Sequence, residues 1–281
     1  MGMTSDSAET QPHPDLSGLV QKYTGSAVSG FTPGLHLGAP NPSLLLVLTL
    51  RDHPVTLATT HHGNNGSTVF SSVLAGLQLS PVLISHEASS HALTIHFTPS
   101  GVRSLLGIPA TELVGQAVPA DAVLGRSVEG LRQRVEMSDD WIARFRLVDA
   151  FLRRRLPDRR QPGALAVTAW VAITTSQGRR PVASLARDLR CSPRTLHATV
   201  KAEIGFGPKA LARVVRFSTA RAHVHQRLLG GEREPTLAQL AADCGYADET
   251  HLIHEWSSFN GTTPMSWRTH DEFAFHQAHP R

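Results

Sequence analysis

The sequence contains few cysteines and no long apolar run. Of its 281 residues only Cys191 and Cys244 are cysteines, which excludes the dense disulfide framework of small secreted domains. The longest obvious apolar run, residues 44–48, is far below the roughly 18 residues that a membrane helix needs. The N-terminus is polar and mildly acidic, without the basic and apolar regions of a signal peptide. We therefore expect a cytoplasmic protein with no membrane partner. We expect its cysteines to be small buried apolar residues rather than a disulfide or a reactive pair.

Signatures of catalysis and of metal binding are also missing. No nucleophile–base signature and no phosphate-binding loop appears, so we expect no enzymatic activity. Among 16 histidines, His86, His91 and His96 lie close in sequence. Residues five apart point to opposite faces of a regular strand, so His91 and His96 do not line one pocket. We expect neither a metal site nor a cofactor.

Acidic side chains are scarce in one segment of the chain. The net charge is only +4, but residues 176–230 carry eleven basic side chains against Asp188 and Glu203 alone, a balance of +9. Residues 231–281 carry three basic and eight acidic side chains, a balance of −5. A merely well-solvated surface would intersperse both signs. The basic segment is therefore typical of a surface that binds a polyanion.

The first hundred residues predict a β-rich region. Residues 1–30 are rich in Ser, Thr, Gly and Pro and show no period, so we expect a loose tail there. Short runs rich in leucine or β-branched residues, separated by Pro, Gly and Asn, follow this tail. They predict strands at 44–50, 55–59, 68–74, 82–85 and 91–97, which together would form a small β-sandwich or barrel.

Helical patterns begin after these strands. Ser100 is a candidate cap for a short helix that Gly107 ends. Another helix begins at Asp139 or Asp140, and its apolar residues recur on one face. The arginines at 153–155 at the end of that helix suit the negative pole of the helix dipole; a phosphate-binding patch is the alternative. Further short or full helices are expected after residue 108 and at 124–135 and 164–175.

Two stretches near the C-terminus repeat each other. Equivalent positions, from Leu185 and Leu240 to Pro208 and Pro264, are 55 or 56 residues apart. Each copy has a helix-like apolar period, a short turn, a capping residue (Ser192 in the first copy and Asp248 in the second) and a second helix. This is the layout of a helix-turn-helix. The units cover 181–205 and 236–261, and a connecting helix covers 209–229. Two such units point toward duplex DNA.

The inward-facing anchors of each second helix determine which residues face outward. Leu196 and Val200 anchor the first helix, and Leu252 and Trp256 anchor the second. A helix presented in this way enters a major groove about 12 Å wide. We expect base contacts from Arg194, His197, Ala198, Glu249, Thr250, Ile253 and His254. We expect phosphate contacts from Arg190, Thr195, Lys201, Lys209 and His251.

These stretches resemble a known family. The segments LARDLRCSPRTLHATVKAEIGFGPKALARVVRF and LAADCGYADETHLIHEWSSFNGTTPMSW are similar to the DNA-binding domain of AraC/XylS bacterial transcription regulators. Residues 35–160 resemble the N-terminal domain of an actinobacterial subgroup. The resemblance implies an α+β chain with a β-rich effector or dimerisation domain and its helical attachments at 31–160, a linker helix within 161–177, and an all-α double helix-turn-helix domain at 178–281. It implies promoter DNA as partner, with RNA polymerase, a small-molecule effector and a second copy as further candidates.

The chain also departs from the family pattern. Members commonly carry an arginine where this chain has Ala198 and His254, and basic residues where it has Ser257 and Ser258. We therefore expect the first unit to supply most of the DNA affinity. Two alternatives remain. One is an effector-binding regulator that acts through protein partners and whose own DNA-binding domain is degenerate. The other, an enzyme like the DNA-repair methyltransferases that join a related DNA-binding domain to a reactive cysteine, is disfavoured because both cysteines lie inside the repeated units.

Overall fold

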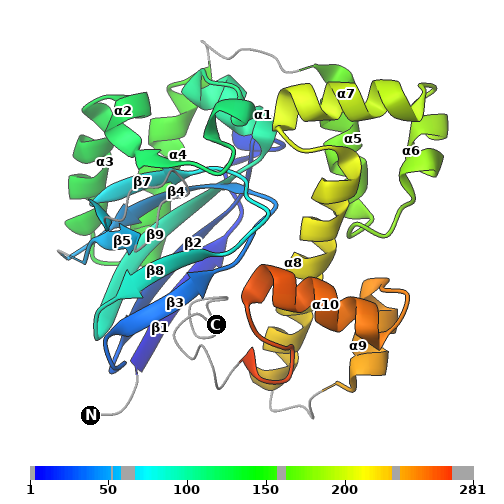
Figure 1. Ribbon diagram of the computed structural model, residues 1–281. Coiled ribbons are helices and arrows are strands. Elements are labelled where there is room, and N and C mark those ends of the chain that lie inside the picture. Colours follow the sequence, from blue (N-terminus) through cyan, green and yellow to red (C-terminus); the bar gives the residue numbers. More distant parts are fainter. Residues whose placement is uncertain (1–3, 52, 58–66, 157–162, 230–234, 268–281) are drawn as a thin grey trace.

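The computed structural model describes residues 4–51, 53–57, 67–156, 163–229 and 235–267. These residues form a β-rich N-terminal part with attached helices and an all-α C-terminal part (Figure 1). The predicted α+β architecture is confirmed. No helix in the described ranges combines the length and apolar character that crossing a bilayer requires.

The larger sheet has six antiparallel strands. Their order is β1 (Thr4–Thr10), β2 (Val20–Ser29), β9 (Ser89–Phe97), β4 (Leu44–Thr49), β7 (Ser72–Ala75) and β10 (Ala117–Pro119). The prediction of a loose tail at residues 1–30 is wrong for the described residues, since β1 and β2 pair along their whole shared length. The strands are polar, and an irregularity between Val20 and Lys22 interrupts the alternation of buried and exposed residues in β2, so no period is visible in the sequence.

A smaller antiparallel sheet faces the larger one. It consists of β3 (Gly34–Gly38), β8 (Val82–His86), β5 (Val55–Leu57) and β6 (Thr68–Phe70). The strands expected between residues 44 and 97 are confirmed within the described residues, outside which residues 58–59 of the strand expected at 55–59 lie. The segment 68–74 differs from the prediction in forming two strands, β6 and β7. The two histidines of β9 lie on opposite faces as expected. His91 accepts a hydrogen bond from Arg144 on the helical side, whereas His96 lines the space between the sheets.

Helices cover the outer face of the larger sheet. They are α2 (Ala120–Leu124), α3 (Ser127–Glu136) and α4 (Trp141–Arg153), preceded by the short segments η1 (Pro14–Leu16), α1 (Pro99–Gly101), η2 (Val102–Leu106) and η3 (Ala110–Leu113). Asp140 caps α4 as expected, with its Oδ1 accepting from the Ala143 amide at 2.7 Å. The cap predicted at Ser100 is wrong. Thr98 caps α1 instead, because Pro99 then occupies the first helical position, where a missing N–H costs nothing.

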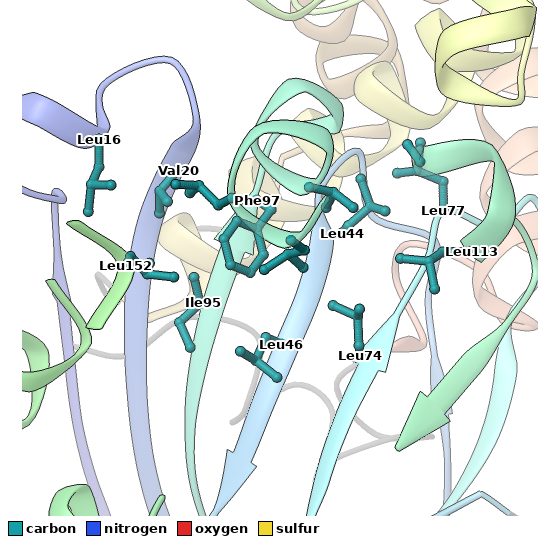
Figure 2. Close-up of a cluster of buried hydrophobic side chains, with 14 of the residues drawn as sticks. Leu16, Val20, Leu44, Leu46, Leu74, Leu77, Ile95, Phe97, Leu113 and Leu152 are labelled. Atoms are coloured by element: carbon teal, nitrogen blue, oxygen red, sulfur yellow. The ribbon is translucent and has the colours of Figure 1, made fainter. Parts of the chain in front are cut away.

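The main core lies between this sheet face and the helices. Figure 2 shows Leu44, Leu46, Ile95 and Phe97 gathered there, all fully buried. Alternate residues of the same strands, among them Leu45 and Thr94, face the smaller sheet. Gly25 allows α4 to approach closely, because a Cβ at this position would collide with the Trp141 ring.

The described residues of the C-terminal part form six helices. They are α5 (Ala164–Thr175), α6 (Val182–Asp188), α7 (Pro193–Ile204), α8 (Pro208–Leu229), α9 (Leu237–Cys244) and α10 (Glu249–Asn260). Helix α8 occupies the region where the connecting helix is expected, residues 209–229. Both cysteines are free thiols. Cys244 is buried, which raises its pKa to about 11, and Cys191 is half-buried against the core.

Candidate nucleic-acid interface

The first helix-turn-helix is formed by α6 and α7. Ser192 caps α7, with its Oγ accepting from the Thr195 amide at 3.0 Å, and Pro193 occupies the first turn. Leu196, Val200 and Ile204 are buried along one side of the helix, so the opposite side faces solvent. The predicted contact residues Arg190, Arg194, Thr195, His197, Ala198, Lys201 and Lys209 are all exposed.

Two of these exposed residues are restrained by their neighbours. The ring of His197 lies against Gly207, where an added Cβ would collide with it. The Thr195 hydroxyl lies 2.8 Å from that of Ser192. In contrast, Arg190, Arg194, Lys201 and Lys209 form no ion pair with any described residue. These four cations are therefore the side chains of this unit best able to meet an anionic backbone.

The second helix-turn-helix is formed by α9 and α10. Thr236 and Gln239 form a capping box at the start of α9, and Asp248 caps α10 by accepting from the His251 amide at 2.7 Å. The anchors Leu252 and Trp256 are fully buried. Of the predicted contact residues, Glu249, Thr250 and His254 are exposed, whereas Ile253 and His251 are partly buried. The exposed face of α10 thus carries a carboxylate and no Lys or Arg.

A buried carboxylate holds α10 against α8. Glu255 is only 5% exposed, and its Oε1 accepts from Nε of Arg213 at 2.6 Å. Arg216 lies 3.7 Å away on the other oxygen, and His251 Nε2 lies 3.5 Å from Oε1. Arg216 also stacks over the Tyr246 ring at 5.1 Å. The ion pairs thus join α8 to α10, and the cation–π contact joins α8 to the turn before α10.

This network corrects part of the charge argument. The sequence assigned Arg213 and Arg216 to the positive surface of the basic segment, but Glu255 pairs with both of them. The sequence does not reveal the role of Glu255, because its two arginine partners lie far away in the chain. The shorter of these two ion pairs, with Arg213, joins residues that are 42 positions apart. The available signal was an acidic residue directly before the buried anchor Trp256, on the face where arginines of a neighbouring helix reach it.

Both units also contact the N-terminal part. Arg103 of η2 pairs with Glu203 of α7 at 3.1 Å. A Cβ at Gly205, which ends α7 with a φ of 94°, would collide with Val114, and one at Gly261 after α10 would collide with Leu37 of β3. The C-terminal ends of α7 and α10 therefore lie against the β-rich part, while their N-terminal halves are directed away from these contacts.

A cavity of about 770 Å³ lies between the two sheets. One part of its lining is apolar, with Val47, Val55, Leu57, Val73 and Ile84 from both sheets. Another part is polar and contains Thr24, His36, His86 and His96. The cavity exists because the inner face of the larger sheet carries small or β-branched side chains that do not fill the space between the layers.

Helix α8 closes one side of this cavity. Ser218, Thr219, Arg221, Ala222, His223 and Gln226 line it from the C-terminal part. Burial, with His86 and Arg221 nearby, lowers the pKa of His36 to about 3, so this ring is neutral at physiological pH. Among the described lining residues Glu87 is the one carboxylate, and it is exposed. A cationic ligand would thus find no buried counter-charge here.

Comparisons with known proteins divide the chain in the same way. Residues 185–270 match a family model described as a helix-turn-helix domain, and residues 8–119 match a domain of unknown function, DUF6597. No characterised protein is similar enough in sequence to count as a match.

Solved structures of ToxT from Vibrio cholerae have a similar fold. An apo variant from strain SCE256 has a TM-score of 0.52 at 12% identity, over 87% of this chain and 96% of that one. A second ToxT structure has a TM-score of 0.50 at 10% identity, over 95% and 98%. The chain therefore joins an N-terminal region that matches DUF6597 to a C-terminal helix-turn-helix domain, and it shares its fold with the ToxT structures.

Proposed function

We propose that this protein binds promoter DNA sequence-specifically through the outward faces of α7 and α10, under control of a small molecule bound between the sheets. The observation that carries the DNA proposal is the outward face of α7. Its anchors are buried, and the cations on and beside it have no partner among the described residues.

In this proposal α7 and α10 read bases in two major-groove segments. The guanidinium of Arg194 donates bidentate hydrogen bonds to guanine O6 and N7, and His197 and Ala198 lie on the same face of α7. On α10, Glu249, Thr250, Ile253 and His254 meet the second segment. Arg190, Thr195, Lys201, Lys209 and His251 contact phosphates. His251 is the weakest of these, because it already lies beside Glu255.

The two units contribute unequally. The first presents four unpaired cations, whereas the exposed face of α10 presents Glu249 and no cation. Phosphate contacts supply most non-specific DNA affinity and make it salt-dependent. The first unit therefore supplies most of the affinity, and the second adds base selectivity.

The small-molecule proposal depends on the shared wall of the cavity. A ligand between the sheets would touch both the N-terminal domain and α8, the helix that joins the two units. Its binding energy would then differ between arrangements of the two domains, which is the requirement for a ligand to change DNA binding. The lining favours a neutral or anionic molecule with an apolar portion. RNA polymerase and a second copy of the chain are further proposed partners.

A binding selection followed by a salt titration tests the DNA proposal. Sequencing the genomic fragments retained by the purified full chain gives the site, and fluorescence anisotropy on that site gives the affinity. We expect log Kd to rise linearly with log salt concentration. Selection of no recurring sequence, together with binding that does not respond to salt, would favour the alternative of a regulator acting through protein partners.

A further inference from the structure

A second pocket lies between α3 and α4, in the part of the molecule far from α6 (Figure 1). Its volume is about 380 Å³, and it is lined by Ser127, Gly130, Arg134, Phe151, Arg154 and Arg155. Every charged residue in this lining is an arginine. We call this site the arginine pocket. It includes two of the three consecutive arginines that the DNA-binding role leaves unexplained.

Arg155 is half-buried in the pocket, and no described residue supplies a counter-charge to it. Its Nη2 donates to the Ser127 hydroxyl at 2.9 Å and to the Leu124 carbonyl at 3.4 Å, and its Cζ lies 4.7 Å from the Phe151 ring centroid. Burial lowers the pKa of this guanidinium, and no carboxylate in the described part of the chain opposes the effect. Neutral acceptors only partly compensate for removing a cation from water.

The carboxylates of α3 and α4 are all engaged elsewhere. Glu129 and Glu136 hold Arg132 at 2.9 and 3.0 Å. Asp149 accepts from the Tyr23 hydroxyl at 2.8 Å and from the His13 amide at 3.0 Å. The two helices that form the pocket therefore contribute positive charge to it and no negative charge.

The dipole of α4 does not explain this arrangement. A helix C-terminus favours nearby cations, and Arg153, which pairs with Asp15 at 2.8 Å, is accounted for without the pocket. Arg134, however, comes from α3, and its Nε donates to the Gly130 carbonyl at 3.1 Å. Its two terminal nitrogens have no acceptor among the described residues. Like charges thus converge from two helices on one concave site.

We propose that the arginine pocket binds a phosphate group of a small phosphorylated molecule. The planar guanidinium fork matches two oxygens of a phosphate, and Arg134, Arg154 and Arg155 together offer several such donors. An anion bound here would reduce the repulsion among these arginines and would supply a counter-charge to Arg155. The distance from α6 and α7 (Figure 1) favours a free molecule over the backbone of DNA bound by the same chain.

Calorimetric titration of the full chain with sodium pyrophosphate, at constant ionic strength, tests this proposal. We expect saturable binding at one site, weakened about tenfold by Arg134→Gln and by Arg154→Gln, because each removes a charge-assisted hydrogen-bond donor. Both side chains are exposed, so these variants should fold. Arg155→Gln should abolish binding. Arg146→Gln, an exposed arginine of α4 outside the pocket, is the matched control and should bind like the parent.

Two further titrations separate the sources of phosphate. AMP should bind and adenosine should not, which assigns recognition to the phosphate. The double variant Arg134→Gln/Arg154→Gln should bind the selected DNA site with unchanged affinity and salt dependence if the pocket serves a free molecule. A salt slope smaller by about two would assign the same phosphate site to DNA backbone. Pyrophosphate binding that is absent from the parent, or equal in the parent and all pocket variants, would overturn the proposal.

Discussion

The two helix-turn-helix units have the same layout but are held in place differently. In the first unit, Leu185, Leu196 and Val200 belong to the same continuous core as Leu44 and Phe97 of the larger sheet. The second unit packs around a separate core of α8, α9 and α10, to which the N-terminal domain adds only the partly buried Ala39. Its orientation relies on the buried Glu255 network. Apolar packing and the Arg103–Glu203 ion pair thus join the first unit to the N-terminal domain, whereas the ion pairs of Glu255 hold α10 of the second unit against α8. Different substitutions should therefore loosen each unit.

Glu255→Gln should have the largest effect. It leaves Arg213 and the mostly buried Arg216 without a counter-charge, which should lower the free energy of unfolding by about 3 kcal/mol. Urea denaturation followed by tryptophan fluorescence measures this change. The loss should fall on the second unit, to which Glu255 belongs. Fluorescence detects it there because Trp256 and Trp267 lie in the core of this unit.

Glu249→Gln is the matched control for that experiment. Glu249 is an exposed carboxylate on the same helix, and its substitution should alter stability by less than about 0.5 kcal/mol. Equal stability of the two variants would mean that the charge network does not hold the second unit.

Arg194→Ala tests the inequality of DNA affinity. It should weaken binding to the selected site by about 2 kcal/mol, since a bidentate contact with guanine contributes about 1–3 kcal/mol. Thr250→Ala on α10 should cost less. Fluorescence anisotropy at one salt concentration compares the two, and equal losses would contradict the asymmetry.

Acid should destabilise the region beside the second unit. His36 lies in β3, directly before Leu37, which contacts Gly261. Burial holds the pKa of His36 at about 3 in the folded chain. The unfolded chain gains a proton below about 6.5 while the folded chain does not, so stability falls as pH drops from 6.5 toward 3. At pH 5 the loss due to His36 alone should be roughly 2 kcal/mol.

Thermal unfolding at pH 7.5 and 5.0 measures this loss. His36→Gln should reduce the pH dependence without abolishing it, because His91, whose pKa burial lowers to about 4, destabilises the folded chain over the same range. An unchanged dependence would place the acid sensitivity at other groups.

The smallest effects concern single phosphate contacts. Lys201→Gln and Lys209→Gln should each reduce the salt slope of DNA binding by about one while weakening binding evenly across sequences. Arg146→Gln on the distant α4 should leave the slope unchanged. Slopes that stay the same in both lysine variants would remove the first unit from the phosphate contact.

Local signals made much of this molecule predictable. Asp140, Ser192 and Asp248 each cap the helix that they were expected to cap, because capping depends on residues only three apart. The inward and outward faces of α7 also follow from its apolar spacing. These features need no knowledge of distant residues.

Features that depend on distant residues were missed. The polar strand β1 is stabilised by backbone pairing with β2, which leaves no hydrophobic period to detect. Arg213 looks like surface charge until Glu255 folds against it. The cavity could not be foreseen, because it depends on which strand faces meet and on how α8 approaches them.

The length of α8 limits how a bound ligand can act. Its 22 residues span about 33 Å at 1.5 Å per residue, close to the roughly 34 Å of one DNA turn. A ligand that touches residues 218–226 contacts the middle and later turns of α8, the helix that joins the two units. Because α8 is one continuous helix, a change in its orientation would move both units together. The expected response is therefore a changed preference for the spacing and phase of the two half-sites along the duplex, with base preference within each half-site preserved.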